Sequence, residues 1–330
     1  MNRSILTIFI AILIVICYSC GSKVPVSPEN SDIWTTYTTK NGLTSNEVHC
    51  LAFDPQNRLW IGTEYGVSIF DGTNWSTLNT QNGLIYHTIH DIFIESSTAA
   101  WFATPLGASH LENGTWNNYT INQGLIDTQV RSIAVDNDGA VWFATPSGVS
   151  KFQFSTWTHY IKKGPYSLVY DRVNKVVVDD ENNKWFGTEF GISKFDGVNW
   201  VTQIQDAQIP NSQLLDFVFT IFIDSNGDYW FGTLGGVAFF SGQSWTFYNQ
   251  SQNGLLFNEV RAIAEDKAGN MWFGGIYGVS KFDGSNWTTY NMNDGLASNY
   301  VTSIVVDTDD NIWFGTLGGG ITKLTKEENQ

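Results

Sequence analysis

Side chains that could bind a ligand recur along this 330-residue chain at intervals of 41 to 45 residues. Each follows the Val or Ile that opens an apolar run, and the seven positions hold His49, His90, Arg131, Asn174, Phe219, Arg261 and Thr302. Imidazole, guanidinium and amide groups beside aromatic rings suit the binding of a carbohydrate or a peptide, through bidentate hydrogen bonds and ring stacking. Such residues at equivalent points of seven repeats predict a polar mouth to one central channel.

Two further sets of variable residues lie in the turns of the same repeats. One set stands between the motif W-F-G-T and the next glycine, and its candidate binding residues are Glu64, Tyr65, Glu189, Phe190 and Tyr277. The other set stands in the links between repeats, with Tyr86, His87 and Tyr300 as candidates. We expect both sets to form a ligand-binding face at the channel mouth. The alternative is that the rings only pack on adjacent loops and the polar residues line a water-filled channel.

Some acidic turns and histidines have the types, but not the spacing, of metal ligands. The segments "DNDGA" at 136–140 and "DSNGD" at 224–228 resemble fragments of a calcium loop, but they lack its downstream glutamate and recur as turns in other repeats. His87 and His90 are three residues apart at a junction of loop and strand, not on a helix. No G-x-S-x-G, Walker-type or dinucleotide-binding motif occurs. We therefore expect no metal site, no cofactor and no catalytic residue.

The elements that position these residues are visible in the tryptophans, all fourteen of which fall into two series with one spacing. The first series is Trp60, Trp101, Trp142, Trp185, Trp230, Trp272 and Trp313, and the second is Trp34, Trp75, Trp116, Trp157, Trp200, Trp245 and Trp287. Around each tryptophan of the first series, the sequence follows the pattern V-x-x-I-x-x-D, a polar turn, W-F-G-T, two variable residues and G-V-S-x-F. Short runs rich in Val, Ile, Phe and Trp, bounded by Gly, Asn and Asp, are typical of strands joined by tight turns.

Each repeat supplies four strands when the segment around the second tryptophan is added. Four strands about every 42 residues predict an all-β fold, a seven-bladed β-propeller of four-stranded antiparallel blades over residues 33–324. The last repeat supplies only three strands, at about 301–306, 311–316 and 320–324. We expect an N-terminal strand at Ile33–Thr38 to complete this last blade and close the ring, which would leave no open sheet edge.

The tryptophans are interpreted as scaffold and not as ligand-stacking residues. In "LWIGT" at 59–63, Trp60 and Gly62 should point to one face of the sheet. The indole would then reach the neighbouring blade, while the glycine would leave room for an aromatic ring from that blade. We expect both series to be buried in this way.

The first residues are typical of a secretory leader. Residues 1–19 contain a basic residue, a short apolar run and a small residue just before Cys20. This order resembles a lipoprotein-type signal peptide, with Cys20 as the lipidated residue and a flexible tether at 20–32. Residues 325–330 read as a polar tail. We expect an exported chain that is lipid-anchored to the bacterial envelope, at the outer membrane or the periplasmic face, or is otherwise secreted.

Charge and cysteine content exclude some partners and cross-links. With 17 Lys and Arg against 32 Asp and Glu, the formal net charge is −15. Nucleic acid is not an expected partner, and a membrane is expected only through the lipid anchor, because both surfaces demand a basic face. Past Cys20 the only cysteine is Cys50, predicted to be a buried core thiol, so no intramolecular disulfide can form. We expect a monomer.

The segments "NIWFGT", "GVSKFDG" and "DGLASNYV" resemble the two-component regulator propeller repeat over about residues 33–324. That repeat is found in periplasmic sensor regions of hybrid sensor kinases, especially in bacteria that degrade polysaccharides. The resemblance implies a non-enzymatic, sensor-like, envelope-exposed propeller whose partner is an extracellular glycan or another envelope protein. No kinase modules follow residue 324, so we expect no phosphorylation by this chain itself.

Two other functions stay open. Streptogramin lyases are also seven-bladed propellers and use magnesium with histidine and glutamate near the axis. If this chain resembles them in activity, the candidates are His49, His90, Glu47 and Glu259. The other alternative is a purely architectural role within a larger envelope assembly.

Overall fold

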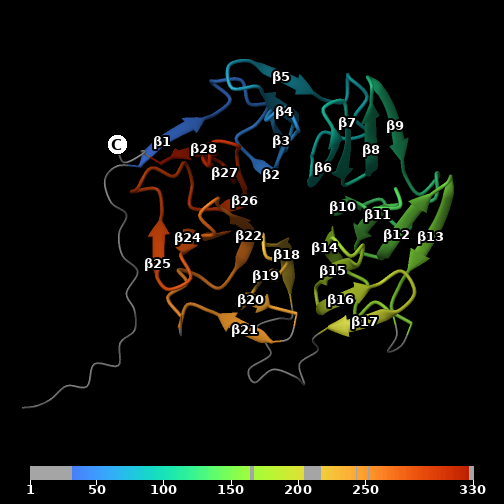
Figure 1. The fold of residues 1–330 in the computed structure, drawn as a ribbon. Helices are drawn as coiled ribbons and strands as arrows, with labels where there is room; N and C mark the ends of the chain where they lie inside the picture. Colours follow the sequence, from blue (N-terminus) through green and yellow to red (C-terminus); the bar gives the residue numbers. More distant parts are fainter. Residues whose placement is uncertain (1–31, 164–166, 204–216, 243, 252, 327–330) are drawn as a thin grey trace, which may run out of the picture.

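The computed structural model describes residues 32–163, 167–203, 217–242, 244–251 and 253–326. These residues form seven four-stranded antiparallel sheets and no helix. Figure 1 shows the sheets arranged as blades around a common axis, with one strand of each blade innermost. The predicted all-β, seven-bladed propeller is confirmed.

The strands follow one order in every blade, from the axis outward. Blade 1 consists of β2 (Val48–Phe53), β3 (Leu59–Thr63), β4 (Gly66–Phe70) and β5 (Trp75–Leu78). Blade 2 consists of β6 (Asp91–Ser96), β7 (Ala99–Thr104), β8 (Gly107–Glu112) and β9 (Thr115–Tyr119). Blade 3 consists of β10 (Ser132–Val135), β11 (Val141–Thr145), β12 (Gly148–Gln153) and β13 (Thr156–Tyr160). Blade 4 consists of β14 (Val173–Val178), β15 (Lys184–Thr188), β16 (Gly191–Phe195) and β17 (Trp200–Gln203).

The remaining three blades repeat this order. Blade 5 consists of β18 (Val218–Ile223), β19 (Tyr229–Thr233), β20 (Gly236–Phe240) and β21 (Trp245–Tyr248). Blade 6 consists of β22 (Val260–Glu265), β23 (Met271–Gly275), β24 (Gly278–Phe282) and β25 (Trp287–Tyr290). Blade 7 consists of β26 (Val301–Val306), β27 (Ile312–Thr316), β28 (Gly320–Thr325) and β1 (Ile33–Tyr37).

Blade 7 is closed by the N-terminal strand, as predicted. β1 pairs antiparallel with β28 over its whole length, and Figure 1 shows the two strands side by side. The two faces of β1 pack on different neighbours, because successive side chains of a strand alternate. The ring of Trp34 lies 5.6 Å from that of Tyr290 in blade 6, and the ring of Tyr37 lies 5.3 Å from that of Phe70 in blade 1. This strand therefore links three blades.

The first tryptophan series anchors a hairpin that is repeated in every blade. All seven indoles are buried. Each indole N–H donates, over 2.8–3.0 Å, to the carboxylate six residues earlier, and the pairs are Trp60–Asp54, Trp101–Glu95, Trp142–Asp136, Trp185–Asp179, Trp230–Asp224, Trp272–Asp266 and Trp313–Asp307. In the aspartate hairpins the same carboxylate also accepts backbone N–H groups of the turn. The segments that resembled calcium loops thus serve as turns.

The second tryptophan series is less buried than predicted. These indoles lie on the outermost strands, and only Trp287 is buried, while the other six are half-buried. They stack on rings of the adjacent strand, as Trp75 does on Phe70 with 4.5 Å between centroids. They also cover a glycine of the inter-blade link. A Cβ on Gly295, where φ is +124°, would lie 2.4 Å from Trp34.

The glycine of W-F-G-T has a different role from the predicted one. A Cβ on Gly315 would lie 2.8 Å from Val48 of the next blade, and one on Gly274 would lie 2.6 Å from Val301. The space over this glycine is therefore filled by a branched aliphatic side chain, and the expectation of an aromatic ring was wrong. Close to the axis the blades converge, so the gap between them accepts Val or Ile and excludes the larger ring.

Several expectations fall on residues outside those described. These are the leader at 1–19, the lipidation at Cys20, the tether up to residue 31 and residues 327–330 of the tail. Within the described ranges, no segment forms a helix long and apolar enough to span a bilayer. Cys50 is buried, as expected of a core thiol, and burial raises its pKa.

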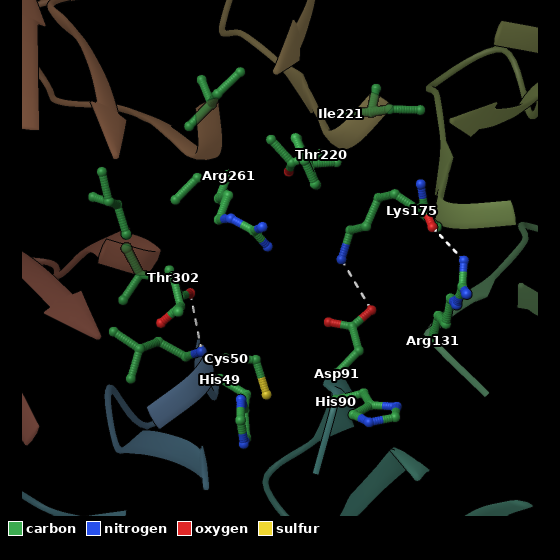
Figure 2. Close-up of a pocket in the computed structure, with 18 of the residues that line it drawn as sticks. His49, Cys50, His90, Asp91, Arg131, Lys175, Thr220, Ile221, Arg261 and Thr302 are labelled. Carbon is green, nitrogen blue, oxygen red and sulfur yellow. Dashed lines mark hydrogen bonds and ion pairs between the residues drawn. The ribbon is translucent and has the colours of Figure 1, made fainter. Parts of the chain in front are cut away.

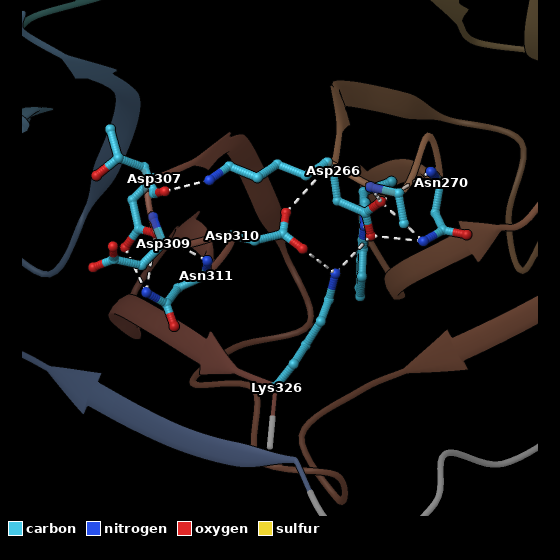
Figure 3. A network of polar contacts seen from close by, with 11 residues as sticks. Asp266, Asn270, Asp307, Asp309, Asp310, Asn311 and Lys326 are labelled. Carbon is cyan, nitrogen blue, oxygen red and sulfur yellow. Dashed lines mark hydrogen bonds and ion pairs between the residues drawn. The ribbon is translucent and has the colours of Figure 1, made fainter. Parts of the chain in front are cut away.

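The hairpin carboxylates make the fold sensitive to acid. Burial alone would raise the pKa of Asp266, but hydrogen bonds from Lys326, Asn270 and the Trp272 indole outweigh burial and lower this pKa to about 2. Figure 3 shows the Lys326 amine between Asp266 and Asp310, at 2.8 and 2.9 Å. The same balance lowers the pKa of the other hairpin acids for which a shift is resolved, which are Asp54, Glu95, Asp136, Asp179 and Asp307.

We expect the free energy of unfolding to fall steeply as the pH drops from about 4 to about 2. A folded-state pKa below the unfolded one means that the unfolded chain binds more protons in this window, so stability is present above it and lost within it. Urea midpoints measured at several pH values by tryptophan fluorescence test this. A midpoint that stays constant between pH 4 and pH 2.5 would contradict this prediction. Lys326→Met should flatten the pH dependence of the midpoint, because it removes the amine that helps to lower the pKa of Asp266.

Candidate functional site

Five of the seven variable positions nearest the axis owe their orientation to an irregularity in the innermost strands. The pairing register shifts between Val48 and Cys50 in β2, and the same shift occurs at the start of β14, β18, β22 and β26. The residues left unpaired by these bulges are His49, Asn174, Phe219, Arg261 and Thr302. A β-bulge re-aims the side chain that it releases. Here it turns the side chain that follows the first Val of each of these five strands toward the axis.

The packing on either side of the bulge agrees with this. Val48 and Leu51 are three residues apart, yet both would contact a Cβ placed on Gly315, at 2.8 and 3.3 Å. Val301 and Ile304 do the same at Gly274. In a regular strand, residues three apart face opposite sides. The spacing V-x-x-I is therefore the sequence signature of the bulge.

A cavity of about 440 Å³ lies at the axis, and Figure 2 shows part of its lining. All seven of the variable axial residues line it, together with Tyr300 from the link into blade 7. The volume falls in the range of pockets that hold small molecules. Because the blades supply His, Arg, Asn, Phe or Thr at the same position, the lining differs around the ring although the framework repeats.

An ion pair across two blades forms part of one wall. Lys175 of blade 4 donates to Asp91 of blade 2 over 2.9 Å. The same Asp91 oxygen accepts from the Ser132 hydroxyl of blade 3 at 2.7 Å. Figure 2 shows the pair within the cavity. Neither charged residue was among the sequence candidates, because both lie one residue beyond the variable position that the repeat comparison singled out.

Arg131 of blade 3 belongs to a second polar group on the same side. Its guanidinium donates to Asn174 at 2.5 Å and to Glu189 at 3.0 Å. Asn174 in turn donates to the Val218 carbonyl at 2.9 Å. Glu189 also pairs with Arg172 at 3.4 Å. Three of the predicted site residues are thus brought together in one network.

Arg261 of blade 6 lies on the opposite, more apolar side. Its guanidinium carbon is 4.4 Å from the ring centroid of Phe219 and 5.4 Å from that of Tyr300. Glu259 Oε1 accepts from its Nε at 2.6 Å and forms an ion pair with Nη2 at 2.5 Å. Ile221, Ile263 and Ile304 continue this wall.

The two axial histidines are each held by a single neighbour. His49 Nε2 lies 3.3 Å from Glu64 Oε2, and His90 Nδ1 lies 2.9 Å from the Val130 carbonyl. Burial lowers the pKa of His90, so this ring is neutral at pH 7. Among the described residues, no three His, Cys, Asp or Glu side chains lie together as metal ligands. The four lyase candidates are not assembled into one cluster, since Glu259 is bound to Arg261.

The loop residues form a rim around the cavity mouth. The backbone N–H of Glu64 donates to the Glu47 carbonyl, so turn and link lie side by side as expected. A buried threonine fixes most of these turns, as Thr63 does by donating to the Gly66 carbonyl at 2.9 Å. Tyr65, Phe190 and Tyr277 stand out at the turn tips, with exposed fractions of 61%, 49% and 62%.

The structure separates the sequence candidates into two groups. Six of them line the cavity, and these are His49, His90, Arg131, Asn174, Arg261 and Tyr300. The other seven lie on the rim or behind the lining, and these are Glu64, Tyr65, Tyr86, His87, Glu189, Phe190 and Tyr277. The rings of Tyr86 and His87 stack at 4.1 Å, and His87 lies 5.8 Å from Tyr65. Some rim aromatics therefore do pack on adjacent loops.

Sequence comparison supplies one family match. The family described as two component regulator propeller matches residues 42–65, 124–147, 212–235, 254–277 and 295–318. Each matched segment contains the two innermost strands of a blade and ends in the turn that follows them. No protein among the curated sequences matches the chain closely enough to count as a relative.

Several solved structures share the fold. The extracellular domain of the putative hybrid two component system BT3049 from B. thetaiotaomicron has a TM-score of 0.74 at 23% identity, covering 89% of this chain and 42% of that one. The extracellular domain of the putative one component system BT4673 from the same organism has a TM-score of 0.72 at 19% identity. The match covers 90% of this chain and 40% of that one. This chain thus spans about two fifths of each of those domains.

A lyase has a similar fold over nearly its whole length. A streptogramin B lyase structure has a TM-score of 0.72 at 14% identity, covering 90% of this chain and 98% of that one. A catalytically inactive virginiamycin B lyase from Staphylococcus aureus, solved with quinupristin, has a TM-score of 0.70 at 15% identity, covering 90% and 100%. At these identities the likeness concerns the fold alone.

Proposed function

We propose that this chain, five segments of which match the two component regulator propeller family, is a non-enzymatic, sensor-like module that binds an extracellular oligosaccharide at the axial cavity and its rim. The observation that carries the proposal is the cavity of about 440 Å³, to which the seven blades contribute five types of side chain, His, Arg, Asn, Phe and Thr, on a common framework. A purely structural ring needs no such variety at its axis. Variable residues on a rigid scaffold are the usual arrangement of a binding site.

The rim supports an oligosaccharide as the ligand. Tyr65, Phe190 and Tyr277 present rings to solvent from three different blades. An exposed ring offers a flat apolar face to the C–H groups of a sugar, while the amides and charged groups of the cavity can bind its hydroxyls. A sugar chain that extends from the cavity across the mouth would contact both.

Export of the chain agrees with such a ligand. Residues 1–20 have the order of a lipoprotein signal, and the similar BT3049 and BT4673 domains are described as extracellular. We infer that the propeller faces the outside of the cell or the periplasm and is anchored through Cys20. A Cys20→Ser chain that still partitions fully with the membrane fraction would contradict the anchor.

Binding should depend on the rim at this end of the propeller. We expect Tyr65→Ala and Tyr277→Ala each to weaken binding of an oligosaccharide about 3- to 10-fold, because each removes one stacking platform. The measurement is calorimetric titration with a panel of neutral and acidic oligosaccharides, and chemical-shift mapping of the ligand that binds.

A matched control is available at the opposite end. Phe154 is 90% exposed in the turn between β12 and β13, away from the cavity mouth, so Phe154→Ala should leave the affinity unchanged. Shifts confined to the Phe154 end, or no binding anywhere in the panel, would overturn the proposal.

A further inference from the structure

We propose that the ligand of the axial cavity carries a carboxylate group, that Arg261 binds this group, and that the ligand is an acidic oligosaccharide containing uronic acid. This inference rests on the proposed function and makes it more specific. It comes from the way in which Arg261 is held and from the charges of the cavity lining.

Arg261 is fixed before any ligand arrives. The rings of Phe219 and Tyr300, from the blades on either side, lie 4.4 and 5.4 Å from its guanidinium carbon. The Glu259 carboxylate accepts from Nε and lies within ion-pair distance of Nη2, which defines the orientation of the guanidinium plane. A planar guanidinium held in this way loses little freedom when it binds a second partner.

The remaining edge of the guanidinium is available to a ligand. Among the described residues, the only hydrogen bond of the guanidinium is the one from Nε to Glu259, so N–H groups of Nη1 and Nη2 remain for a ligand. Figure 2 shows the Arg261 guanidinium and the Lys175 amine pointing toward the middle of the cavity from opposite sides. The Arg261 side chain is 33% exposed, so this edge is accessible. Two parallel N–H groups fit the two oxygens of a carboxylate.

The charge of the lining favours an anion. Three cations, Arg131, Lys175 and Arg261, line the cavity against one carboxylate, Asp91. The acids that pair with the two arginines, Glu189 and Glu259, are not part of the lining. Each of these cations has an acid partner, since Lys175 pairs with Asp91, Arg131 with Glu189 and Arg261 with Glu259. Because Glu189 and Glu259 lie outside the lining, an anionic group that enters the cavity still faces three cationic side chains and one carboxylate.

The surroundings favour a sugar acid over an acidic peptide. Three carboxylates contact residues of the lining, Glu64 at His49, Glu189 at Arg131 and Glu259 at Arg261, and would repel a chain with several adjacent negative charges. A uronic acid instead places one carboxylate among hydroxyl groups, which can donate hydrogen bonds to those same acids. The exposed rings of Tyr65 and Tyr277 at the rim provide stacking faces for adjoining sugars.

The test compares ligands that differ only in the carboxylate. The full mature chain is titrated calorimetrically with oligogalacturonate and oligoglucuronate trimers and with the same trimers after reduction of their carboxyl groups to alcohols. We expect at least one acidic trimer to bind at least about 30-fold more tightly than its reduced form, the scale of a buried charge pair that loses one partner. Added salt should weaken this binding.

Two variants locate the effect at Arg261. Arg261→Met should remove the preference for the acidic trimer, and Arg261→Lys should restore only part of it, because an amine cannot offer two parallel N–H groups. Lys281→Met, which removes one positive charge from β24, where Lys281 packs over Trp272, is the matched control and should leave the preference intact. Thermal melting of each variant verifies the fold.

The outcomes separate this inference from the proposed function. Binding of neutral trimers as tight as that of acidic ones would overturn the carboxylate inference and leave the oligosaccharide site standing. Binding of an acidic peptide, with no binding of the acidic trimers, would overturn the inference that the ligand is a sugar acid. A preference for the acidic trimer that survives Arg261→Met would remove Arg261 from the site. If no sugar of either kind binds, both the inference and the proposed function fall.

Discussion

A chain that begins at Thr38 is expected to lose the folded propeller, whereas one that begins at Asp32 is expected to keep it. The two differ only in Asp32 and in β1, the strand that completes blade 7. Without β1, the backbone of β28 between Gly320 and Thr325 would become an open sheet edge. Unpaired edge strands template association between molecules, so the shorter chain should aggregate.

Side-chain packing adds to this effect. Trp34 lies over the Phe314 ring at 5.8 Å, and Tyr37 stacks on Trp313 at 5.8 Å, so the strand covers both faces of blade 7. Removing a large aromatic from such a contact costs about 3–5 kcal/mol when it is fully buried, and somewhat less for these half-buried rings. The loss of two rings and a full ladder of hydrogen bonds approaches the whole stability of a typical domain.

Light scattering after size-exclusion chromatography measures the outcome, with the chain from Asp32 as the reference. A permuted chain that starts at Thr38 and carries residues 33–37 after residue 326 and a short glycine-rich linker should recover a soluble, cooperatively folding monomer, because the linker allows Ile33 to pair with Thr325. Equal stability of the two truncated chains would show that the ring is not closed by this strand.

Asp136→Ala is expected to lower the free energy of unfolding by about 3–5 kcal/mol. Asp136 Oδ2 accepts from the Trp142 indole at 2.8 Å and lies 3.2 Å from the Lys184 amine of blade 4. The side chains of Lys184 and Asp136 are only 4% and 1% exposed. The substitution would leave the buried indole N–H without its acceptor and the buried Lys184 cation without its counter-ion, with only the Asn182 carbonyl still accepting from that amine. Removing one partner in this way is the costly way to break a buried pair.

The companion variant Lys184→Met should cost less. It removes the buried cation, while Asp136 keeps the indole and the turn N–H groups of Asp138 and Ala140 as donors. Urea unfolding followed by tryptophan fluorescence measures both. Asp71→Ala is the control, since Asp71 accepts two turn N–H groups but is exposed, and its loss should be much smaller. A cost for Asp136→Ala no larger than that for Asp71→Ala would contradict the proposed role of the hairpin acid.

Much of the fold could be predicted because the repeat carries it locally. Every blade has the same strands and turns, so one interpretation of the spacing of Trp60 and its equivalents applied seven times. The closing strand was also predictable, because "IWTTY" at 33–37 matches the outer strand of other blades. The interpretation of Gly315 and its equivalents failed because it considered one strand at a time, and what fills the space over a glycine belongs to the next blade.

The candidate site was predicted in part. Comparison of equivalent positions pointed to His49, Arg131 and Arg261, and the structure places all three in the cavity lining. The comparison of equivalent positions missed Asp91 and Lys175, which are 84 residues apart and form an ion pair near the axis. A repeat pattern aligns residues within blades, and it contains no information about which partners face each other between blades. The ligand itself stays a proposal.

The sequence by itself determined the strands, the number of blades, the closing strand and the positions at which the blades differ, because those properties follow from periodicity and turn chemistry within a single repeat. Only the tertiary structure decided how those differing residues are used. The bulge at the start of five innermost strands turns them toward the axis, and the ring geometry brings Arg261 between the aromatic residues of its two neighbours. Both effects depend on packing between blades, where side chains distant in sequence share the same space.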